Sequence, residues 1–196
     1  MSSVRNILLC VSGASGSIYA KKFIGNIIKE RYLRLYIIFT QTAKEVWKHE
    51  VGEDFLDFKE NLLRENDNVE FIENDNFFHK FSSGSNVLNS MVVLPCSMGT
   101  LARIAQGVSF DLIGRIADVQ LKEKRTLVVV PRETPYNLIH LKNMQALIEA
   151  GAIIAPASPS FYNKYNSIDE LADNFSKRVL EIANIKDLTE QNRWGN

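Results

Sequence analysis

The sequence has little cysteine, little histidine and no excess of either charge. Its 196 residues include two cysteines, Cys10 and Cys96, and both lie inside apolar runs. This usage excludes a disulfide framework and favours buried thiols. The three histidines fall in no metal-ligand spacing, so we expect no structural metal. The 23 basic residues balance 23 acidic ones, and no global field is therefore present to attract nucleic acid or an anionic membrane surface.

Long apolar runs are also missing from the sequence. No run approaches the ~18 residues of a membrane span, and residues 1–6 lack the pattern of a signal peptide. We therefore expect a cytoplasmic protein without a membrane span. The chain contains no internal repeat, low-complexity tract or linker. With 45% hydrophobic residues, its length suits a single domain, residues 1–196, with a sizeable core.

The sequence does contain a regular alternation of two kinds of segment. Apolar runs of strand length alternate with segments of helical period. Strands that are apolar throughout are typical of a parallel sheet covered by helices on both faces. The pattern therefore predicts an α/β fold, a doubly wound parallel sheet in a three-layer sandwich. The expected strands are 6–12, 34–40, 90–96, 125–131 and 151–157, and the expected helices lie near 17–30, 41–50, 98–106, 111–122, 135–150 and 167–183.

Residues 51–82 do not fit this alternation. They are polar, acidic and weakly periodic, which leaves open either short edge strands or a helix. The start of the last helix is better defined. Ser167 is followed three positions later by Glu170, and serine and glutamate at this spacing are typical of a capping box.

Two of the expected strands run into turns of small hydroxyl and glycine residues. "SGASGS" (12–17) follows the first strand and "PCSMGT" (95–100) follows the third, each at the start of a helix. The carboxyl ends of parallel strands form one edge of the sheet, and helix N-termini at that edge favour anions. One such turn alone could be a plain tight turn, but two at one edge indicate a polar, phosphate-bearing ligand. A similar turn, "FSSGS" (81–85), lies just upstream of the third strand.

The fourth strand ends on an adjacent pair of opposite charges, Arg132 and Glu133. We expect both side chains to point into the same crevice. Arg115 and Lys122 lie seven residues apart and therefore on roughly one helix face, where a surface charge stripe is the simpler interpretation. Together with Arg132 and with Arg178 on the last helix, they suit a phosphate group on a substrate, in addition to that of a cofactor.

With these residues in view, the chain resembles the flavin prenyltransferases, the UbiX family, whose members have also been described as aromatic-acid decarboxylases. The resemblance covers nearly the whole chain, and its motifs are specific. They are "GASGSIYA" (13–20), "SSGS" (82–85), "PCSMGTL" (95–101), "RIADVQLKEKRTLVVVPRETP" (115–135), "IHLKNM" (139–144), "GAIIAPASPSFY" (151–162) and "RWG" (193–195).

The resemblance implies a flavodoxin-like or Rossmann-type flavoprotein domain that assembles into a homododecamer, with active sites at subunit interfaces. The C-terminal helix and tail, residues 167–196, are expected to pack on a neighbouring subunit or on their own sheet. The implied activity joins the dimethylallyl group of dimethylallyl phosphate to reduced FMN, without a metal; whether a mono- or a diphosphate is used stays open. The product, prenylated FMN, is the cofactor of a partner UbiD-type decarboxylase, including the one of ubiquinone synthesis.

The resemblance also implies roles for individual residues. The FMN-binding positions are Gly13, Ala14, Ser15, Thr40, Ser97, Met98, Gly99, Thr100 and Arg132. The positions that hold the prenyl phosphate are Lys122, Tyr162 and Arg178, with Arg115 and Glu133 beside them. The expected catalytic set is Glu133, Ser15, Glu50, Lys122 and Arg115.

Within this set, the cations would stabilise the departing phosphate, and Glu133 would move protons between flavin and phosphate. Glu50, which by itself is best explained as a solvated carboxylate, matches a carboxylate contributed across an interface. An aromatic lid position falls at Phe77 or Phe78.

Three other functions are compatible with parts of the pattern. An FMN-dependent decarboxylase of the cysteine-decarboxylase type would rely on a histidine at the flavin, and none stands at the corresponding strand ends. A direct aromatic-acid decarboxylase would release carbon dioxide unaided. A non-catalytic FMN-binding subunit of a decarboxylase complex would leave the mass of FMN unchanged in the presence of dimethylallyl phosphate and a reductant.

Overall fold

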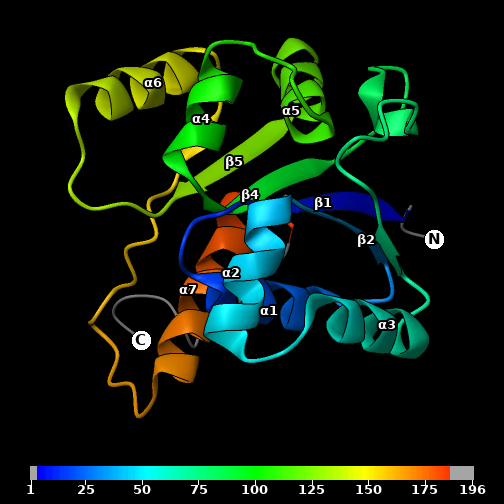
Figure 1. The fold of residues 1–196 in the computed structure, drawn as a ribbon, viewed down its shortest axis with the longest axis vertical. Coiled ribbons are helices and arrows are strands. Elements are labelled where there is room, and N and C mark those ends of the chain that lie inside the picture. The colour runs from blue at the N-terminus through cyan, green and yellow to red at the C-terminus, as the bar shows by residue number, and fades with distance from the viewer. Residues whose placement is uncertain (1–3, 186–196) are drawn as a thin grey trace.

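The computed structural model describes residues 4–185, which form one six-stranded sheet between two layers of helices (Figure 1). All neighbouring strands pair in parallel, in the order β3-β2-β1-β4-β5-β6. This order is that of doubly wound nucleotide-binding sheets, and it reverses direction between β1 and β4. The predicted fold class is confirmed. The strands are β1 (Arg5–Val11), β2 (Leu33–Phe39), β3 (Val69–Phe71), β4 (Ser90–Cys96), β5 (Thr126–Pro131) and β6 (Ile153–Ile154).

The helices divide between the two faces of the sheet. One core cluster joins the sheet to α1 (Ser17–Ile27), α2 (Gln41–Val51), α3 (Phe55–Glu65) and α7 (Ile168–Ile182). The other joins it to α4 (Met98–Ala105), α5 (Leu112–Lys122), α6 (Leu138–Glu149) and the short 3₁₀ helix η1 (Lys80–Ser82). All the strands run in the same direction and helices connect them, so the loops that leave the strands gather at one edge.

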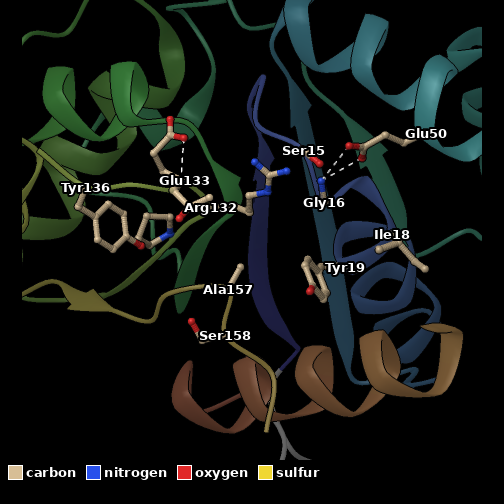
Figure 2. A pocket seen from close by; sticks show the side chains of 12 residues that line it. Ser15, Gly16, Ile18, Tyr19, Glu50, Arg132, Glu133, Tyr136, Ala157 and Ser158 are labelled. Atoms are coloured by element: carbon tan, nitrogen blue, oxygen red, sulfur yellow. Dashed lines mark hydrogen bonds between the residues drawn. The ribbon is translucent and has the colours of Figure 1, made fainter. Parts of the chain in front are cut away.

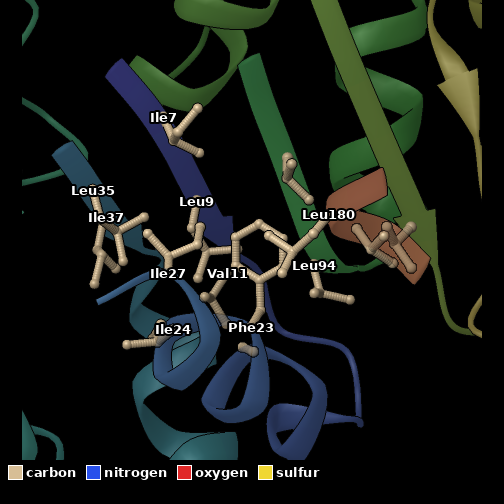
Figure 3. Packing of buried hydrophobic residues seen from close by; sticks show 14 of the residues in the cluster. Ile7, Leu9, Val11, Phe23, Ile24, Ile27, Leu35, Ile37, Leu94 and Leu180 are labelled. Atoms are coloured by element: carbon tan, nitrogen blue, oxygen red, sulfur yellow. The ribbon is translucent and has the colours of Figure 1, made fainter. Parts of the chain in front are cut away.

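Strand β1 explains why consecutive residues in the middle of the strands are apolar. Ile7 and Leu9 pack into the cluster with α1 and α7 (Figure 3), whereas Leu8 and Cys10 pack into the cluster with α4 and α5. Since both faces are covered, neither set of alternating side chains meets water. Cys10 and Cys96 are buried and unpaired, and burial raises the pKa of Cys96 to about 12. The prediction of buried thiols is confirmed.

Residues 51–82 contain both of the structures that the sequence left open. Helix α3 buries Phe55, Phe58 and Leu62, which recur at helical spacing, and turns its acidic face to solvent. Asp54 caps it by accepting a hydrogen bond from the Leu56 N–H at 3.0 Å. Strand β3 then adds a short edge to β2. The acidic solvent face is what obscured the helical period in the sequence.

The expected strand 151–157 is shorter in the structure, where β6 holds two residues. The chain nevertheless remains extended along β5, because the Ala155 N–H donates to the Val129 carbonyl and the Ala157 N–H donates to the Pro131 carbonyl, both at 2.9 Å. Pro156, between them, has no N–H to donate. Helix α6, which lies between β5 and β6, begins at Leu138 rather than at 135, because Asn137 and His140 cap each other's backbone there.

Helix α7 packs against the sheet of its own chain. The Ser176 hydroxyl donates to the Tyr19 carbonyl at 2.8 Å, and the buried Ser90 hydroxyl donates to the Ala183 carbonyl at 2.7 Å. The expected tail of the C-terminal segment, residues 186–196 with the "RWG" motif, lies outside the described residues. Within residues 4–185, every helix is too short or too polar to span a bilayer.

Candidate functional site

Three backbone hydrogen bonds tie together the loops that leave the central strands. The Ser12 N–H donates to the Pro95 carbonyl and the Arg132 N–H donates to the Cys96 carbonyl, both at 3.2 Å; the third is the bond from Ala157 to Pro131. The loops after β1, β4, β5 and β6 therefore meet where the strand order reverses. A pocket of about 510 Å³ lies at this edge, a size suited to a small organic ligand. Its lining residues are Ser15, Gly16, Ile18, Tyr19, Glu50, Pro131, Arg132, Glu133, Thr134, Tyr136, Ala157 and Ser158.

The turn between β1 and α1 depends on two glycines. A Cβ atom on Gly13 would lie 2.5 Å from Cγ2 of Thr42, so only glycine lets α2 pack this closely on the turn. Gly16 adopts φ +117°, a left-handed conformation that side chains disfavour. These constraints bring α2 and the start of α1 together, and they place Ser15 on the pocket wall.

Glu50 on α2 occupies the N-terminus of α1. Its carboxylate accepts hydrogen bonds from the N–H groups of Gly16 at 2.9 Å and Ser17 at 2.8 Å. Partial burial acts to raise the pKa of Glu50, but hydrogen bonds from the Ser15 hydroxyl and from these two N–H groups outweigh it and hold the pKa below its ordinary value. Glu50 thus lines the pocket of its own chain. The expectation that it is contributed across an interface stays a prediction. The sequence predicted an anion at this helix N-terminus, and in the structure the Glu50 side chain takes that position.

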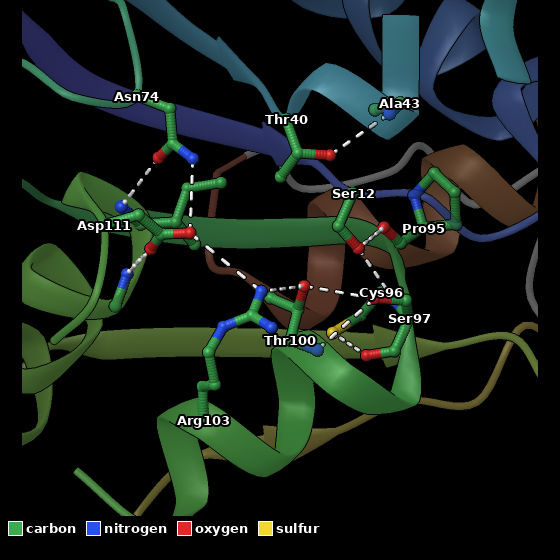
Figure 4. A network of polar contacts seen from close by, with 12 residues as sticks. Ser12, Thr40, Ala43, Asn74, Pro95, Cys96, Ser97, Thr100, Arg103 and Asp111 are labelled. Atoms are coloured by element: carbon green, nitrogen blue, oxygen red, sulfur yellow. Dashed lines mark hydrogen bonds and ion pairs between the residues drawn. The ribbon is translucent and has the colours of Figure 1, made fainter. Parts of the chain in front are cut away.

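The second expected turn leads into α4, and its hydroxyl groups are joined in a polar network (Figure 4). The Ser97 N–H donates to the Ser12 hydroxyl at 2.8 Å, and the Ser97 hydroxyl accepts from the Thr100 N–H and donates to its hydroxyl. Thr100 in turn accepts from Arg103, which pairs with Asp111 at 4.0 Å. Ser97 therefore shapes the start of α4. The N–H groups of Met98 and Gly99, the first two residues of α4, have no carbonyl partners inside the helix. They are therefore suited to an external anion.

Thr40 has a similar structural role at the end of β2. Its hydroxyl accepts a hydrogen bond from the Ala43 N–H at 3.1 Å and so caps α2. As the acceptor in this bond, the hydroxyl keeps its own proton available for a ligand.

Arg132 and Glu133 both line the pocket, as their position after β5 predicted. Figure 2 shows the Arg132 guanidinium directed toward the turn of Ser15 and Gly16, with Glu50 and Glu133 on opposite sides of it. The Glu133 carboxylate accepts a hydrogen bond from the Thr134 N–H at 2.9 Å. The pocket thus presents one guanidinium between two carboxylates and a serine hydroxyl.

The other predicted cations lie elsewhere in the chain, so the expected cluster of four is not formed within one subunit. Lys122 ends α5 just before β5 begins, whereas Arg132 follows the end of β5. Six strand residues at about 3.3 Å each separate them by roughly 20 Å. Lys122 pairs with Glu123 at 3.3 Å, and Arg178 on α7 pairs with Glu181 at 2.8 Å.

Arg115 lies with Lys122 on α5, away from the pocket. It pairs with Asp118 at 2.8 Å and donates to the Ser82 carbonyl at 3.1 Å. The "FSSGS" turn therefore belongs to the side of the sheet where β4 begins, and not to the edge that holds the pocket. Tyr162 is 76% exposed in the loop before α7, and Phe77 and Phe78 are also exposed. None of these three lines the pocket.

Several pocket residues were not among those predicted, and Tyr19 is the most informative of them. It lies in the first turn of α1, directly after the glycine- and serine-rich turn, so the "GASGSIYA" motif contained the signal. Burial raises the pKa of Tyr19, although the neighbouring Arg132 acts to lower it. The phenol is therefore a neutral hydrogen-bond donor. Tyr136 and Ser158 join the pocket only because the β5 and β6 loops fold over it.

A parallel sheet with a pocket at its switch point defines a nucleotide-binding α/β protein. The Flavoprotein family model matches residues 1–180. The Flavin prenyltransferase UbiX of Methanocaldococcus jannaschii is 41% identical over 189 residues, which cover 96% of this chain and 98% of that protein. The chain belongs to the flavin prenyltransferase UbiX family of flavoproteins.

Solved structures agree with this assignment. The dodecameric FMN-dependent UbiX-like decarboxylase of Escherichia coli O157:H7 is 31% identical with a TM-score of 0.88, covering 97% of this chain and all of that one. AnUbiX (PadA1), in complex with FMN and dimethylallyl pyrophosphate, is 35% identical with a TM-score of 0.85, covering 97% and 98% of the two chains.

Replacing Glu50 by Gln tests the internal cap of α1. Gln keeps the size of the side chain but removes its charge, so we expect the free energy of unfolding at pH 7 to fall by about 1 kcal/mol. Because the pKa of Glu50 is lowered in the folded protein, the wild-type advantage is full above the unfolded pKa of about 4.3 and disappears as the pH falls through the folded value. Urea denaturation at pH 7 and at low pH measures both effects.

Glu45→Gln is the matched control, since Glu45 lies on the same helix and is exposed. It should leave the free energy of unfolding unchanged. A Glu50→Gln protein as stable as wild type at pH 7 would contradict the capping role.

Proposed function

We propose that this protein transfers the dimethylallyl group of dimethylallyl phosphate to reduced FMN and releases prenylated FMN. One observation carries the proposal: a single pocket holds Ser15, Glu50, Arg132 and Glu133 at the switch point of a flavoprotein fold. Family membership supports the reaction, and the AnUbiX complex contains both FMN and an allylic phosphate ester.

The contacts at the two helix starts support a placement for the FMN phosphate. Glu50 already occupies the N–H groups at the start of α1, so that helix has little room for a second anion. We assign the phosphate to the start of α4, where Met98 and Gly99 present N–H groups and Ser97 and Thr100 fix the backbone. The flavin ring would then lie between Gly13–Ser15 and Arg132, which line or border the pocket.

The chain's own residues would act on charge and protons. Reduced FMN, when bound, supplies the nucleophilic nitrogen and carbon, and the allylic carbon–oxygen bond breaks with its electrons leaving on the phosphate. Glu133, at the pocket wall, would accept or relay the protons that the flavin loses. The Ser15 hydroxyl, hydrogen-bonded to Glu50, would be a second proton carrier of fixed orientation. Holding both reactants in one pocket removes much of the entropic barrier.

The remaining cations would come from neighbouring copies of the chain. Arg132 is the only cation among the lining residues within the described part of the chain, and a phosphate leaving group is better stabilised by several. Lys122 and Arg115 lie on α5, Arg178 lies on α7 and Tyr162 lies in the loop before α7, all at least partly exposed. A closed symmetric assembly places different surfaces of identical chains against each other. We therefore propose a homo-oligomer, as large as the dodecamer of the E. coli relative, whose sites are completed at interfaces.

The product would be passed to a UbiD-type decarboxylase in the cytoplasm. Prenylated FMN is the cofactor that such decarboxylases require, as the family resemblance implies. The alternatives are direct decarboxylation of an aromatic acid and passive FMN binding. Relatives that share 34–41% identity and carry the prenyltransferase name favour prenyl transfer over both.

Mass spectrometry of the flavin tests the proposal. The protein is incubated anaerobically with FMN, a reductant and dimethylallyl phosphate, and the flavin is then extracted. We expect its mass to increase by one C₅H₈ unit, with one phosphate released for each flavin. Unchanged FMN would leave only the binding function, and carbon dioxide released from an aromatic acid without a partner would favour the direct decarboxylase.

Glu133→Gln should retain FMN binding but slow formation of the prenylated product by about 100-fold, the scale of a lost general acid–base group. FMN affinity is measured by fluorescence titration and product formation by single-turnover spectroscopy. Wild-type turnover at saturating dimethylallyl phosphate would remove Glu133 from the proton-transfer role.

Arg178→Ala should weaken binding of dimethylallyl phosphate about tenfold or more, because a charge-assisted hydrogen bond to the phosphate is lost. FMN affinity should stay within about twofold of the wild-type value, because Arg178 is assigned to the prenyl phosphate and no hydrogen bond to FMN is lost. Lys177→Ala is the control, since it removes a neighbouring cation of α7 that pairs with Asp173. Equal losses of affinity for both ligands in Arg178→Ala would show that the substrate assignment is wrong.

A further inference from the structure

Tyr19 forms part of the pocket wall without any role in the function proposed so far. It lies in the first turn of α1, on the side of the pocket that faces α7 (Figure 2). Its ring is half-buried and packs against the core cluster shared by α1 and α7. The ring therefore separates the pocket from the hydrophobic core behind it.

Three contacts hold the ring in this position. Phe175 of α7 packs behind it, with ring centroids 4.9 Å apart. In front, the backbone of Gly16 lies so close that a Cβ there would be 3.0 Å from the Tyr19 ring. The Ser176 hydroxyl fixes the Tyr19 backbone through its carbonyl at 2.8 Å. A ring held from both sides cannot move aside for a larger ligand without disturbing α7.

The position of Tyr19 indicates which ligand it meets. In the proposed placement the flavin lies between Gly13–Ser15 and Arg132, on one side of the Tyr19 ring. The allylic substrate would then take the remaining part of the pocket, beside Ala157 and Ser158, with its phosphate held by cations from neighbouring copies. The Tyr19 ring walls off this part of the pocket from the core between α1 and α7.

We propose that the aromatic ring of Tyr19 determines substrate size, by closing the pocket behind the dimethylallyl group and excluding longer allylic chains. This inference rests on the proposed function. The apolar ring face suits a five-carbon chain, and the core behind it leaves no space for another isoprene unit. Truncation of the ring opens a cavity in front of Phe175, in which a ten-carbon chain gains room.

The test compares dimethylallyl phosphate with geranyl phosphate, its ten-carbon homologue. Binding of each to the FMN-loaded protein is measured by calorimetry in air, where FMN stays oxidised, and turnover is measured anaerobically. We expect Tyr19→Ala to shift both the affinity ratio and the kcat/KM ratio toward geranyl phosphate by about tenfold or more, the discrimination typical of added methylene groups in an apolar pocket.

Three further variants separate the ring from other effects. Tyr19→Phe keeps the ring and should keep the wild-type ratios. Tyr19→Leu, a smaller loss of packing, should give an intermediate shift and replaces Tyr19→Ala if that protein fails to fold. Tyr32→Ala removes a tyrosine before the start of β2, remote from the pocket, and should change neither ratio.

The outcomes distinguish the inference from the function on which it rests. Wild-type protein that forms no prenylated FMN contradicts the proposed function, and the affinity ratios then still decide the role of Tyr19. Unchanged ratios in folded Tyr19→Ala or Tyr19→Leu overturn the inference even where wild-type turnover is normal. A shift in Tyr19→Phe as large as in Tyr19→Ala would assign the effect to the hydroxyl and also overturn it.

Discussion

The site depends on the hydrogen bonds that continue between strands β1, β4, β5 and β6 just past their carboxyl ends. Backbone groups of Ser12, Arg132 and Ala157 bond to the neighbouring strand ends at 2.9–3.2 Å, so the loops leave the sheet in fixed register. Because backbone atoms set this register, residues 132 and 15 lie opposite one another regardless of which side chains they carry. The buried apolar strands therefore hold the pocket in place, although they contribute little of its lining.

The starts of α1 and α4 differ although both follow glycine- and serine-rich turns. At α1 the Glu50 carboxylate takes the exposed N–H groups and is itself kept ionised by them. At α4 a serine caps the helix from within its own turn, and the first N–H groups stay available. The two turns of similar composition therefore differ in function: one holds an ionised side chain, and the other is suited to a phosphate. Similar sequence at a strand end does not imply a similar ligand.

The sheet and most helices could be predicted from the sequence, because buried strands and amphipathic helices leave strong local patterns. That Arg132 and the Ser15 turn lie at the same edge of the sheet followed from the topology alone. Glu50 could not be placed, since its reach into the pocket depends on the close packing of α2 against Gly13, a contact between distant segments. For Lys122, the helix that carries it was predicted correctly. The edge of the sheet at which it lies was not, because that depends on the direction in which α5 crosses the sheet. Tyr19 was missed because an aromatic residue on α1 is equally compatible with the core.

The distance along β5 between Lys122 and Arg132 has a genetic consequence. If sites are shared between copies, a chain altered at Arg132 and a chain altered at Lys122 damage different halves of each site. A mixed assembly then contains some sites built from two intact halves. Two inactive alleles of this one gene could therefore complement each other in the same cell, whereas two alleles that damage the same half would not.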